Sequence, residues 1–306
     1  MLRACGARVF ALVGVMAAVG GLTGCGHPEK HAERTGPPAV VASTDVWGSV
    51  ARAVAGDDAS VSSIITSASA DPHSFEASPS DAAAITDASI VVFNGGGYDS
   101  WVEAVLDNHP DVASIDAYSL LDTAAVGEPQ PANEHVFYEL GTAGAVAQRL
   151  AERLAETDPG HASDYRKRAE EFVKRADSIR AAERALAGEY PGAAVVATEP
   201  VAHYLIRAAG LADKTPKGFT SSIEQDADPA PVDVAAVLDL ITGRDVRAVL
   251  FNDQTVTEVT RQVRGAAEKA GVPVVTVTET LPAGTDYLSW QGDAVKRLTD
   301  ALRESR

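Results

Sequence analysis

Residues 70–81 read ADPHSFEASPSD and link a strand to a helix. The apolar run Val61–Ile65 before them predicts a buried strand. Pro72 disfavours helical backbone at the residue before it and fixes its own φ, so His73 is expected in a loop. Ser78 is expected to cap the next helix, with the following proline at its first position. A histidine between a strand and a helix stands where open α/β sheets place their ligands.

The composition is that of a globular protein. The 306 residues are 45% hydrophobic and 23% charged, which leaves room for two medium domains or one large one. The 43 acidic and 26 basic residues give a formal charge of −17. Such a balance argues against binding nucleic acid, whose phosphates need a basic surface. It is compatible with a cationic ligand, although acidity more often serves solubility.

The N-terminus predicts export and a lipid anchor. Two arginines precede the apolar run Val9–Val19, and residues 22–25 read LTGC, which resembles the bacterial lipobox. We expect a signal peptide at 1–24, lipidation of Cys25 and a flexible tether at 25–38, with the protein held on the outer face of the cell membrane. The alternative is a plain cleaved signal. Cys5 leaves with the signal, so any metal in the mature chain must be held by His, Asp or Glu.

Alternating strand and helix signals predict two α/β lobes. The expected strands are residues 39–42, 61–65, 89–93, 112–115, 193–198, 247–252 and 272–277. Strands that alternate with helices favour parallel sheets covered on both faces. The charged pattern of residues 161–190 predicts a single long helix. We therefore expect an N-terminal lobe at 39–160, a linking helix at 161–190 and a C-terminal lobe at 191–306, with the ligand in the cleft between two Rossmann-like lobes. Residues 118–133 and 214–231 are expected to be polar connections, and residues 95–97 a tight glycine turn.

Four candidate ligands share one topological position. His73 and Glu199 follow predicted strands, Glu279 follows the last one, and His135 opens the helix that leaves the first lobe. The carboxyl ends of the strands in such sheets open onto one crevice, so two facing lobes could bring these residues together. Two imidazoles and two carboxylates suit a divalent transition-metal ion and would give a formally neutral site.

Five segments resemble the metal-binding lipoproteins of ABC importers for zinc and manganese: DPHSFEASPSD (71–81), SIVVFNGGG (89–97), NEHVFYEL (133–140), ATEPVAHYL (197–205) and PVVTVTETLPAGTDYLSW (273–290). The resemblance covers essentially the whole mature chain, in order. It implies two α/β lobes joined by one long helix, with the metal between them. It also implies a monomeric, non-enzymatic capture protein whose partners are a permease and its ATPase. The implied cargo is Zn²⁺ or Mn²⁺, with Fe²⁺ as a third ion.

In the resemblance, His73 and His135 match the first two ligands of the family. The third is a histidine in many zinc importers and a glutamate in many manganese importers, five residues before an aromatic residue. Glu199 precedes Tyr204 by five, which implies Glu199 as the ligand and Tyr204 as a neighbour of the site. His203 competes for the third position but is expected on a helix face.

The fourth family ligand is a carboxylate after the last strand. Glu279 stands there, where aspartate is frequent, and Asp286 is the alternative. Glu224 matches a segment near the cleft, so it either supports the metal ligands without touching the ion or lies on the surface. Two glutamates move the site towards manganese or iron relative to a three-histidine site, but the ligand types do not exclude zinc.

Two other functions are compatible with an exported metal-binding chain. A secreted metal-dependent hydrolase would keep an open coordination position and a general base near the ion. The sequence has neither HExxH nor GxSxG, which counts against hydrolysis. A surface adhesin is the other alternative, and no feature of the sequence argues for it specifically.

Overall fold

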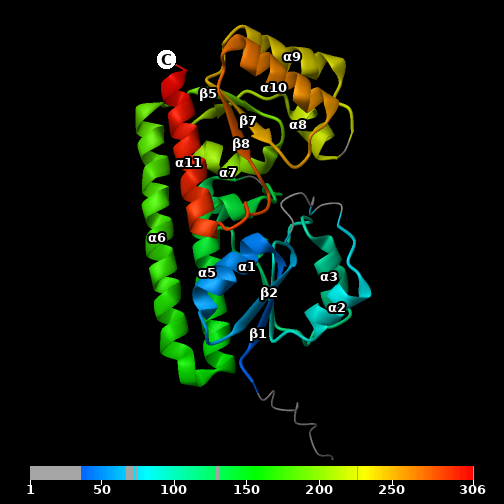
Figure 1. The fold of residues 1–306 in the computed structure, drawn as a ribbon, viewed down its shortest axis with the longest axis vertical. Helices are drawn as coiled ribbons and strands as arrows, with labels where there is room; N and C mark the ends of the chain where they lie inside the picture. Colours follow the sequence, from blue (N-terminus) through cyan, green and yellow to red (C-terminus); the bar gives the residue numbers. More distant parts are fainter. Residues whose placement is uncertain (1–35, 67–71, 73–74, 129–130, 226, 306) are drawn as a thin grey trace, which may run out of the picture. The chain divides into compact units, whose positions relative to one another are not determined.

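The computed structural model describes residues 36–66, 72, 75–128, 131–225 and 227–305. All of these from Pro37 onward belong to one compact unit. His73 and Cys25 lie outside the described residues. Two four-stranded parallel sheets and the helices that cover them form the framework (Figure 1). The predicted fold class, two α/β lobes with one long helix, is confirmed.

The first lobe is a parallel sheet with the strand order β2-β1-β3-β4. Its elements are β1 (Ala39–Thr44), α1 (Asp45–Ala55), β2 (Ser60–Ile65), α2 (Pro79–Thr86), β3 (Ile90–Phe93), α3 (Ser100–Leu106) and β4 (Ser114–Asp116). Successive side chains of a strand point to opposite faces. Val40 and Ala42 therefore join the core cluster that contains α1, whereas Val41 packs in a separate cluster with residues of α2 and α3.

The second lobe repeats this topology with the order β6-β5-β7-β8. Its strands are β5 (Ala194–Ala197), β6 (Ala212–Asp213), β7 (Ala248–Asn252) and β8 (Val274–Val277). Its helices are α7 (His203–Ala208), α8 (Lys217–Glu224), α9 (Pro231–Thr242), α10 (Glu258–Ala270) and α11 (Tyr287–Glu304). Val196 and Val249 pack with residues of α8, α9 and α10, whereas Val195 and Leu250 face the cluster of α7 and α11. Both sheets are thus covered on both faces.

One long helix, α6 (Ala162–Glu189), connects the lobes. It packs against α5 (Leu140–Thr157), which precedes it across the short 3-10 turn η3 (Pro159–His161). Helix α6 also packs on α1 of the first lobe and on α11 of the second. Arg168 of α6 donates from Nε to Val54 O (2.7 Å) and from a terminal nitrogen to Ala55 O (2.9 Å). A cation at the last carbonyls of α1 is favourable, because these groups have no partner within the helix.

The helix start at Ser78 is confirmed in detail. The Ser78 hydroxyl accepts a hydrogen bond from the Asp81 amide (3.3 Å), and the Asp81 carboxylate accepts one from the Ser78 amide (2.8 Å). Pro79 occupies the first helical position, where its missing N–H costs nothing. This capping box fixes the point at which α2 begins.

Several local expectations are wrong. The strand at Val61–Ile65 is not buried: β2 has only β1 beside it, and most of its side chains are exposed or half-buried. Residues 214–231 are not only a polar connection, because α8 lies within them. Residues 118–133 also contain structure, namely the 3-10 turn η1 (Tyr118–Leu120) and the short helix α4 (Thr123–Val126). Two further 3-10 turns, η2 (Val136–Tyr138) and η4 (Pro200–Ala202), lie beside the candidate ligands.

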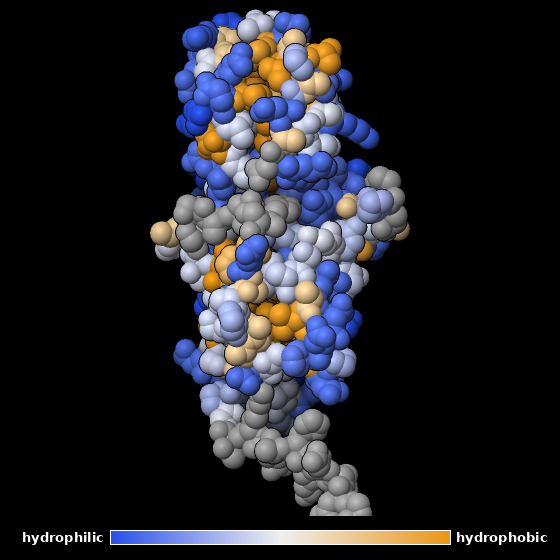
Figure 2. Space-filling model, turned by 90° about the vertical axis from the view of Figure 1, so that its right-hand side faces the viewer, coloured by the Kyte–Doolittle hydropathy of each residue, from blue (hydrophilic) through white to orange (hydrophobic). Residues whose placement is uncertain are grey.

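The surface does not mark a functional site by its hydrophobicity. The face in Figure 2 carries small hydrophobic groups separated by hydrophilic side chains. Among the large hydrophobic side chains described, Val232 and Val256 are exposed. Scattered exposed apolar residues are normal in soluble proteins. Within the described residues, every helix is too short or too polar to cross a membrane.

Candidate metal centre

Three of the four predicted ligands lie in the described part of the chain. His135 immediately precedes η2, Glu199 follows β5, and Glu279 follows β8. All three are almost fully buried, at 1%, 5% and 2% exposure. Asp, Glu and His are rarely buried to this degree unless they are paired or bind a metal. The fourth predicted ligand, His73, lies outside the described residues.

His135 is oriented by its own loop. Asn133 Oδ1 accepts a hydrogen bond from the His135 backbone amide (3.0 Å) and lies 3.2 Å from the ring Nδ1. An amide oxygen accepts only, so Nδ1 is the ring nitrogen that donates to Asn133. Nε2 lies 3.8 Å from Oε2 of Glu279. The imidazole therefore turns Nε2 towards a carboxylate while an amide oxygen orients its other nitrogen, and metal-binding histidines are commonly oriented in this way.

One amide holds both carboxylates of the second lobe. Asn252 is the last residue of β7, the strand between β5 and β8. Its Nδ2 donates to Glu199 Oε2 and to Glu279 Oε1, the latter at 2.9 Å. The hydroxyl of Thr255 donates to the other oxygen of Glu199. Parallel strands end at the same edge of the sheet, so the order β5-β7-β8 places Asn252 between the two glutamates.

The backbone around Glu279 is held by a second amide side chain. Gln254 Oε1 accepts from the amides of Glu279 and Thr280, the latter at 3.1 Å, and its Nε2 donates to the Thr280 hydroxyl (2.8 Å). Tyr138 donates its hydroxyl to Thr278 O (2.9 Å). These bonds fix the turn that follows β8 and hence the direction of the Glu279 carboxylate.

The same turn is fastened to the first lobe. The Leu281 amide donates to Asp45 Oδ1 (3.1 Å), and the Tyr287 amide donates to the Ser49 hydroxyl (2.9 Å). Asp45 and Ser49 are both in α1. Burial raises the pKa of Asp45 above its usual range. Helix α1 therefore anchors both ends of the segment between Glu279 and α11.

Sequence reasoning missed one acidic neighbour of the centre and left another open. Ligand atoms of Glu134, His135 and Glu224 all lie within 4.8 Å of one another. Both glutamates are half-buried. The structure thus places Glu224, the last residue of α8, beside His135 rather than on a remote surface. Glu134 could have been noticed as the residue before His135 in NEHVFYEL.

The remaining candidates have different positions. Tyr204 donates its hydroxyl to Asn133 O (2.6 Å), so it supports the residue that orients His135. His203 instead bonds to Glu128 through Nε2 (2.5 Å), outside the carboxylate pair. Asp286 caps α11 by accepting from the Ser289 amide (2.8 Å), and its side chain is 57% exposed. Asp286 is therefore not part of the buried cluster, and Glu279 is the carboxylate that faces His135.

The glycine turn supports the loop of His135. Asp99 accepts from the amides of Asn94 (2.7 Å) and Gly95 (2.8 Å), and Gly95 has φ +74°, which suits glycine. Burial raises the pKa of Asp99 to about 6 despite these bonds. The side chain of Asn94 donates to Glu134 O (2.8 Å). The turn thus holds the backbone next to His135.

Comparisons with known proteins agree with this architecture. The family model of zinc-uptake complex component A, periplasmic, matches residues 40–301. The manganese-binding lipoprotein MntA of Halalkalibacterium halodurans is 26% identical over 175 residues, which are 57% of this chain and 56% of that protein. The metal ABC transporter substrate-binding lipoprotein ScbA of Streptococcus cristatus is 22% identical over 311 residues, covering 95% of this chain and 97% of its own length.

A solved structure shows the same fold. The periplasmic zinc binding protein TroA from Treponema pallidum superposes with a TM-score of 0.73 over 87% of this chain and 99% of its own, at 18% identity. Identity at this level supports the fold alone. The family model, by contrast, spans most of the chain. The protein therefore belongs to the family of the periplasmic component A of zinc-uptake complexes, the metal-binding substrate-binding proteins of ABC importers.

Proposed function

We propose that the protein captures one divalent transition-metal ion, Zn²⁺ or Mn²⁺, outside the cytoplasm and delivers it to an ABC permease with its ATPase. One observation carries this proposal: the buried carboxylates of Glu199 and Glu279 share a single amide donor, and Glu279 faces Nε2 of His135. Two buried carboxylates are costly unless positive charge lies between them. A divalent cation supplies that charge, and binding and release leave it chemically unchanged.

The proposed ligands are His135, Glu199 and Glu279, with His73 as the fourth. Two imidazoles and two carboxylates around a divalent ion make a formally neutral site. Glu134 and Glu224 lie close enough to His135 to add oxygen atoms around the ion or at its entrance. Asn252 then serves to hold the two carboxylates apart and in place, as hydrogen-bonded neighbours of metal ligands commonly do.

The choice of ion depends on two opposing tendencies. Affinity for nitrogen and oxygen sites rises from Mn²⁺ through Fe²⁺ towards Zn²⁺. An excess of carboxylate oxygen over imidazole moves preference towards Mn²⁺ relative to a site of three histidines. Among the relatives, MntA is named as manganese-binding and TroA as zinc-binding. Zn²⁺ and Mn²⁺ are therefore the two proposed cargoes, and Fe²⁺ is the third to be tested.

The proposal includes the placement of the protein. Lipid on Cys25 anchors a monomer to the outer face of the cell membrane, and residues 25–38 give it reach as a tether. Within the exported chain, residues 39–160 and 191–306 are the lobes, and residues 161–190 connect them. An anchored capture protein stays near its permease, which raises its effective concentration there.

Thermal unfolding with metals tests the proposal. The full chain, purified in mild detergent and stripped with a chelator, would be melted with Zn²⁺, Mn²⁺, Fe²⁺, Ca²⁺ or Mg²⁺. An ion at about 100 times its Kd stabilises a fold by roughly 2.7 kcal/mol. We expect a large rise in Tm with Zn²⁺ or Mn²⁺ and little with Ca²⁺ or Mg²⁺. A cooperative transition that no ion shifts would contradict the proposal.

A further inference from the structure

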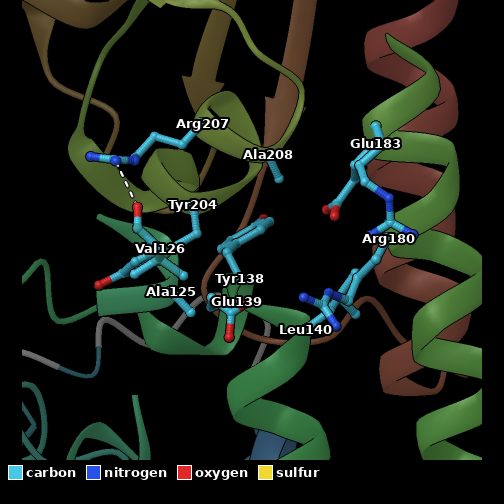
Figure 3. Close-up of a pocket in the computed structure, with 11 residues that line it drawn as sticks. Ala125, Val126, Tyr138, Glu139, Leu140, Arg180, Glu183, Tyr204, Arg207 and Ala208 are labelled. Carbon is cyan, nitrogen blue, oxygen red and sulfur yellow. Dashed lines mark hydrogen bonds between the residues drawn. The ribbon is translucent and has the colours of Figure 1, made fainter. Parts of the chain in front are cut away.

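A separate polar cavity lies where α6 meets the start of α5, with α4 and α7 on its other side (Figure 3). Its volume is about 280 Å³. Neither His135 nor the two carboxylates of the metal centre line it. Pockets for small molecules generally begin at about 300 Å³, so this cavity has the size for a ligand of a few heavy atoms.

Glu183 is the unusual residue of this cavity. It lies on α6, is 3% exposed, and points its carboxyl group into the pocket in Figure 3. Its Oε1 has no hydrogen-bond partner among the described residues. Burial, and then the nearby charge of Glu139, raise the pKa of Glu183 to about 8. A buried carboxyl group without a partner is costly, and a positively charged donor would remove that cost.

The other acid of the cavity is already in use. The Glu139 carboxylate accepts hydrogen bonds from the amides of Gly141 (3.1 Å) and Thr142 (2.5 Å) at the start of α5. It also accepts one from the Thr142 hydroxyl (2.9 Å). Glu139 is thus the N-cap of that helix. A ligand with a positive charge would therefore meet Glu183 as its available acceptor.

One arginine at the cavity is available for an anion. Arg207 is held by Glu128 (2.6 Å) and donates to Val126 O (2.7 Å), the bond drawn in Figure 3. Arg180 pairs with Asp177 (3.1 Å). Arg184, the residue after Glu183, makes no hydrogen bond or ion pair within the described part of the chain. Guanidinium groups bind carboxylates with two parallel hydrogen bonds, which makes Arg184 a suitable carboxylate partner.

The walls between these charges are largely apolar. Leu140 and Ala208 line the cavity together with two tyrosines. The tyrosine hydroxyls are engaged elsewhere, Tyr138 with Thr278 O and Tyr204 with Asn133 O. They therefore offer ring surface to a ligand, while the polar recognition is left to Glu183 and Arg184, which are neighbours on α6.

We propose that this cavity binds a small zwitterion of the α-amino acid class with an apolar side chain, its ammonium group on Glu183 and its carboxylate on Arg184. The apolar side chain lies against Leu140 and Ala208. The arrangement matches the ligand group by group: a buried acceptor, a free guanidinium and an apolar wall. The inference does not depend on the metal proposal, because none of the proposed metal ligands lines the cavity.

Matched ligands test the zwitterion directly. L-leucine, isoamylamine and 4-methylpentanoate share the same branched chain, but the second lacks the carboxylate and the third lacks the ammonium group. Each would be titrated calorimetrically into the full metal-stripped chain in detergent. We expect L-leucine to bind with one site per chain and each analogue at least about tenfold more weakly. Equal binding of either analogue would overturn the zwitterion, and no binding of any of the three would overturn the site.

Three variants identify the residues. Glu183→Gln keeps the shape of a neutral carboxyl group and should fold, but it should weaken L-leucine binding at least about tenfold. Arg184→Gln should weaken it as well. Glu171→Gln makes the same substitution at an exposed position of α6 and should bind as the wild type does. Unchanged binding in the Glu183 variant, with its melting transition intact, would overturn the assignment.

Proton release provides an independent readout. An ammonium group stabilises the ionised form of Glu183, which is otherwise protonated near pH 7. The charged or titratable groups that face it are Glu139 on α5, Arg180 and Arg184 on α6, and Tyr287 on α11. Calorimetry in two buffers of different ionisation enthalpy should show release of about one proton per L-leucine bound near pH 7. The Glu183→Gln variant should show none. Equal heats in both buffers would contradict the ammonium contact.

Discussion

Both lobes place the same dipeptide at the end of their third strand, Phe93-Asn94 in the first and Phe251-Asn252 in the second. Both asparagines are fully buried. Asn94 binds backbone and scaffold: it accepts from Trp47 Nε1 (3.3 Å) and donates to Glu134 O (2.8 Å). Asn252 instead donates to the side chains of Glu199 and Glu279.

The difference shows how one topology can use equivalent positions for two tasks around the candidate metal centre. In the second lobe the two carboxylates stand two residues after the ends of β5 and β8, so the strand-end amide acts on the candidate ligands themselves. In the first lobe the described candidate ligand, His135, belongs to a loop after the sheet, and the strand-end amide acts on the backbone of that loop. The asparagine at the end of the third strand therefore spaces two candidate ligands in the second lobe, whereas in the first lobe it positions a loop.

The largest expected effect comes from removing a ligand of the second lobe. Glu279→Ala should lower the affinity for Zn²⁺ or Mn²⁺ by more than about a hundredfold, because changes to mere neighbours of metal ligands already cost ten- to a hundredfold. Competition with a chromophoric chelator measures this. Asp286→Ala is the matched control, since its exposed carboxylate caps α11 and pairs with Arg175 away from the buried carboxylates, and it should keep wild-type affinity. Equal losses of metal affinity in Glu279→Ala and Asp286→Ala would contradict the assignment of Glu279 as a ligand.

The first lobe should carry a pH dependence through Asp99. Because its pKa is raised from 3.8 to about 6, the folded state holds the proton more tightly than the unfolded state. The protonated Asp99 carboxyl group therefore stabilises the fold fully below pH 3.8. This stabilisation falls by up to roughly 3 kcal/mol as the pH rises from 3.8 through about 6. Urea unfolding of the metal-stripped chain at several pH values should show this fall in the free energy of unfolding, and Asp99→Asn should lack it. If the free energy of unfolding falls equally with pH in both proteins, the raised pKa of a buried Asp99 is contradicted.

The two asparagines provide the sharpest comparison. Asn252→Ala should lower metal affinity about ten- to a hundredfold, because the two carboxylates lose the donor that spaces them. Asn94→Ala should instead lower the free energy of unfolding by about 1 to 2 kcal/mol, since it leaves buried groups at Trp47 and Glu134 unpaired. Its effect on metal affinity should be smaller than that of Asn252→Ala. Chelator competition and urea unfolding on both variants measure the pair, and equal affinity losses would break the distinction between the lobes.

Sequence reasoning was sufficient to place candidate ligands that stand next to strands. Glu199 and Glu279 could be predicted because parallel strands bring their carboxyl ends to one edge, and a strand end is visible as the end of an apolar run. The helix start at Ser78 was predictable for a similar reason, since the capping residues are neighbours in the chain.

Features that depend on sheet order were not predictable. The function of Asn252 requires β7 to lie between β5 and β8, and this order does not follow from the order of the strands in the sequence. The two-residue strand β6 is too short to leave a periodic signal. Helix α8 buries only Phe219 and Ile223, four residues apart among polar neighbours, so its pattern is weak. The edge position of β2 likewise depends on its neighbours in space.

The two bonds from α1 to the turn beyond Glu279 have a kinetic consequence. Asp45 and Ser49 fasten Leu281 and Tyr287 to the first lobe, so the Glu279 carboxylate cannot move away with the second lobe unless these bonds open. If Glu279 holds the ion as proposed, the ion should stay until a local opening occurs, whatever the speed of its arrival. We expect helix α1 to govern the residence time of the cargo, and a permease that contacts α1 would act on the slowest step of the transfer.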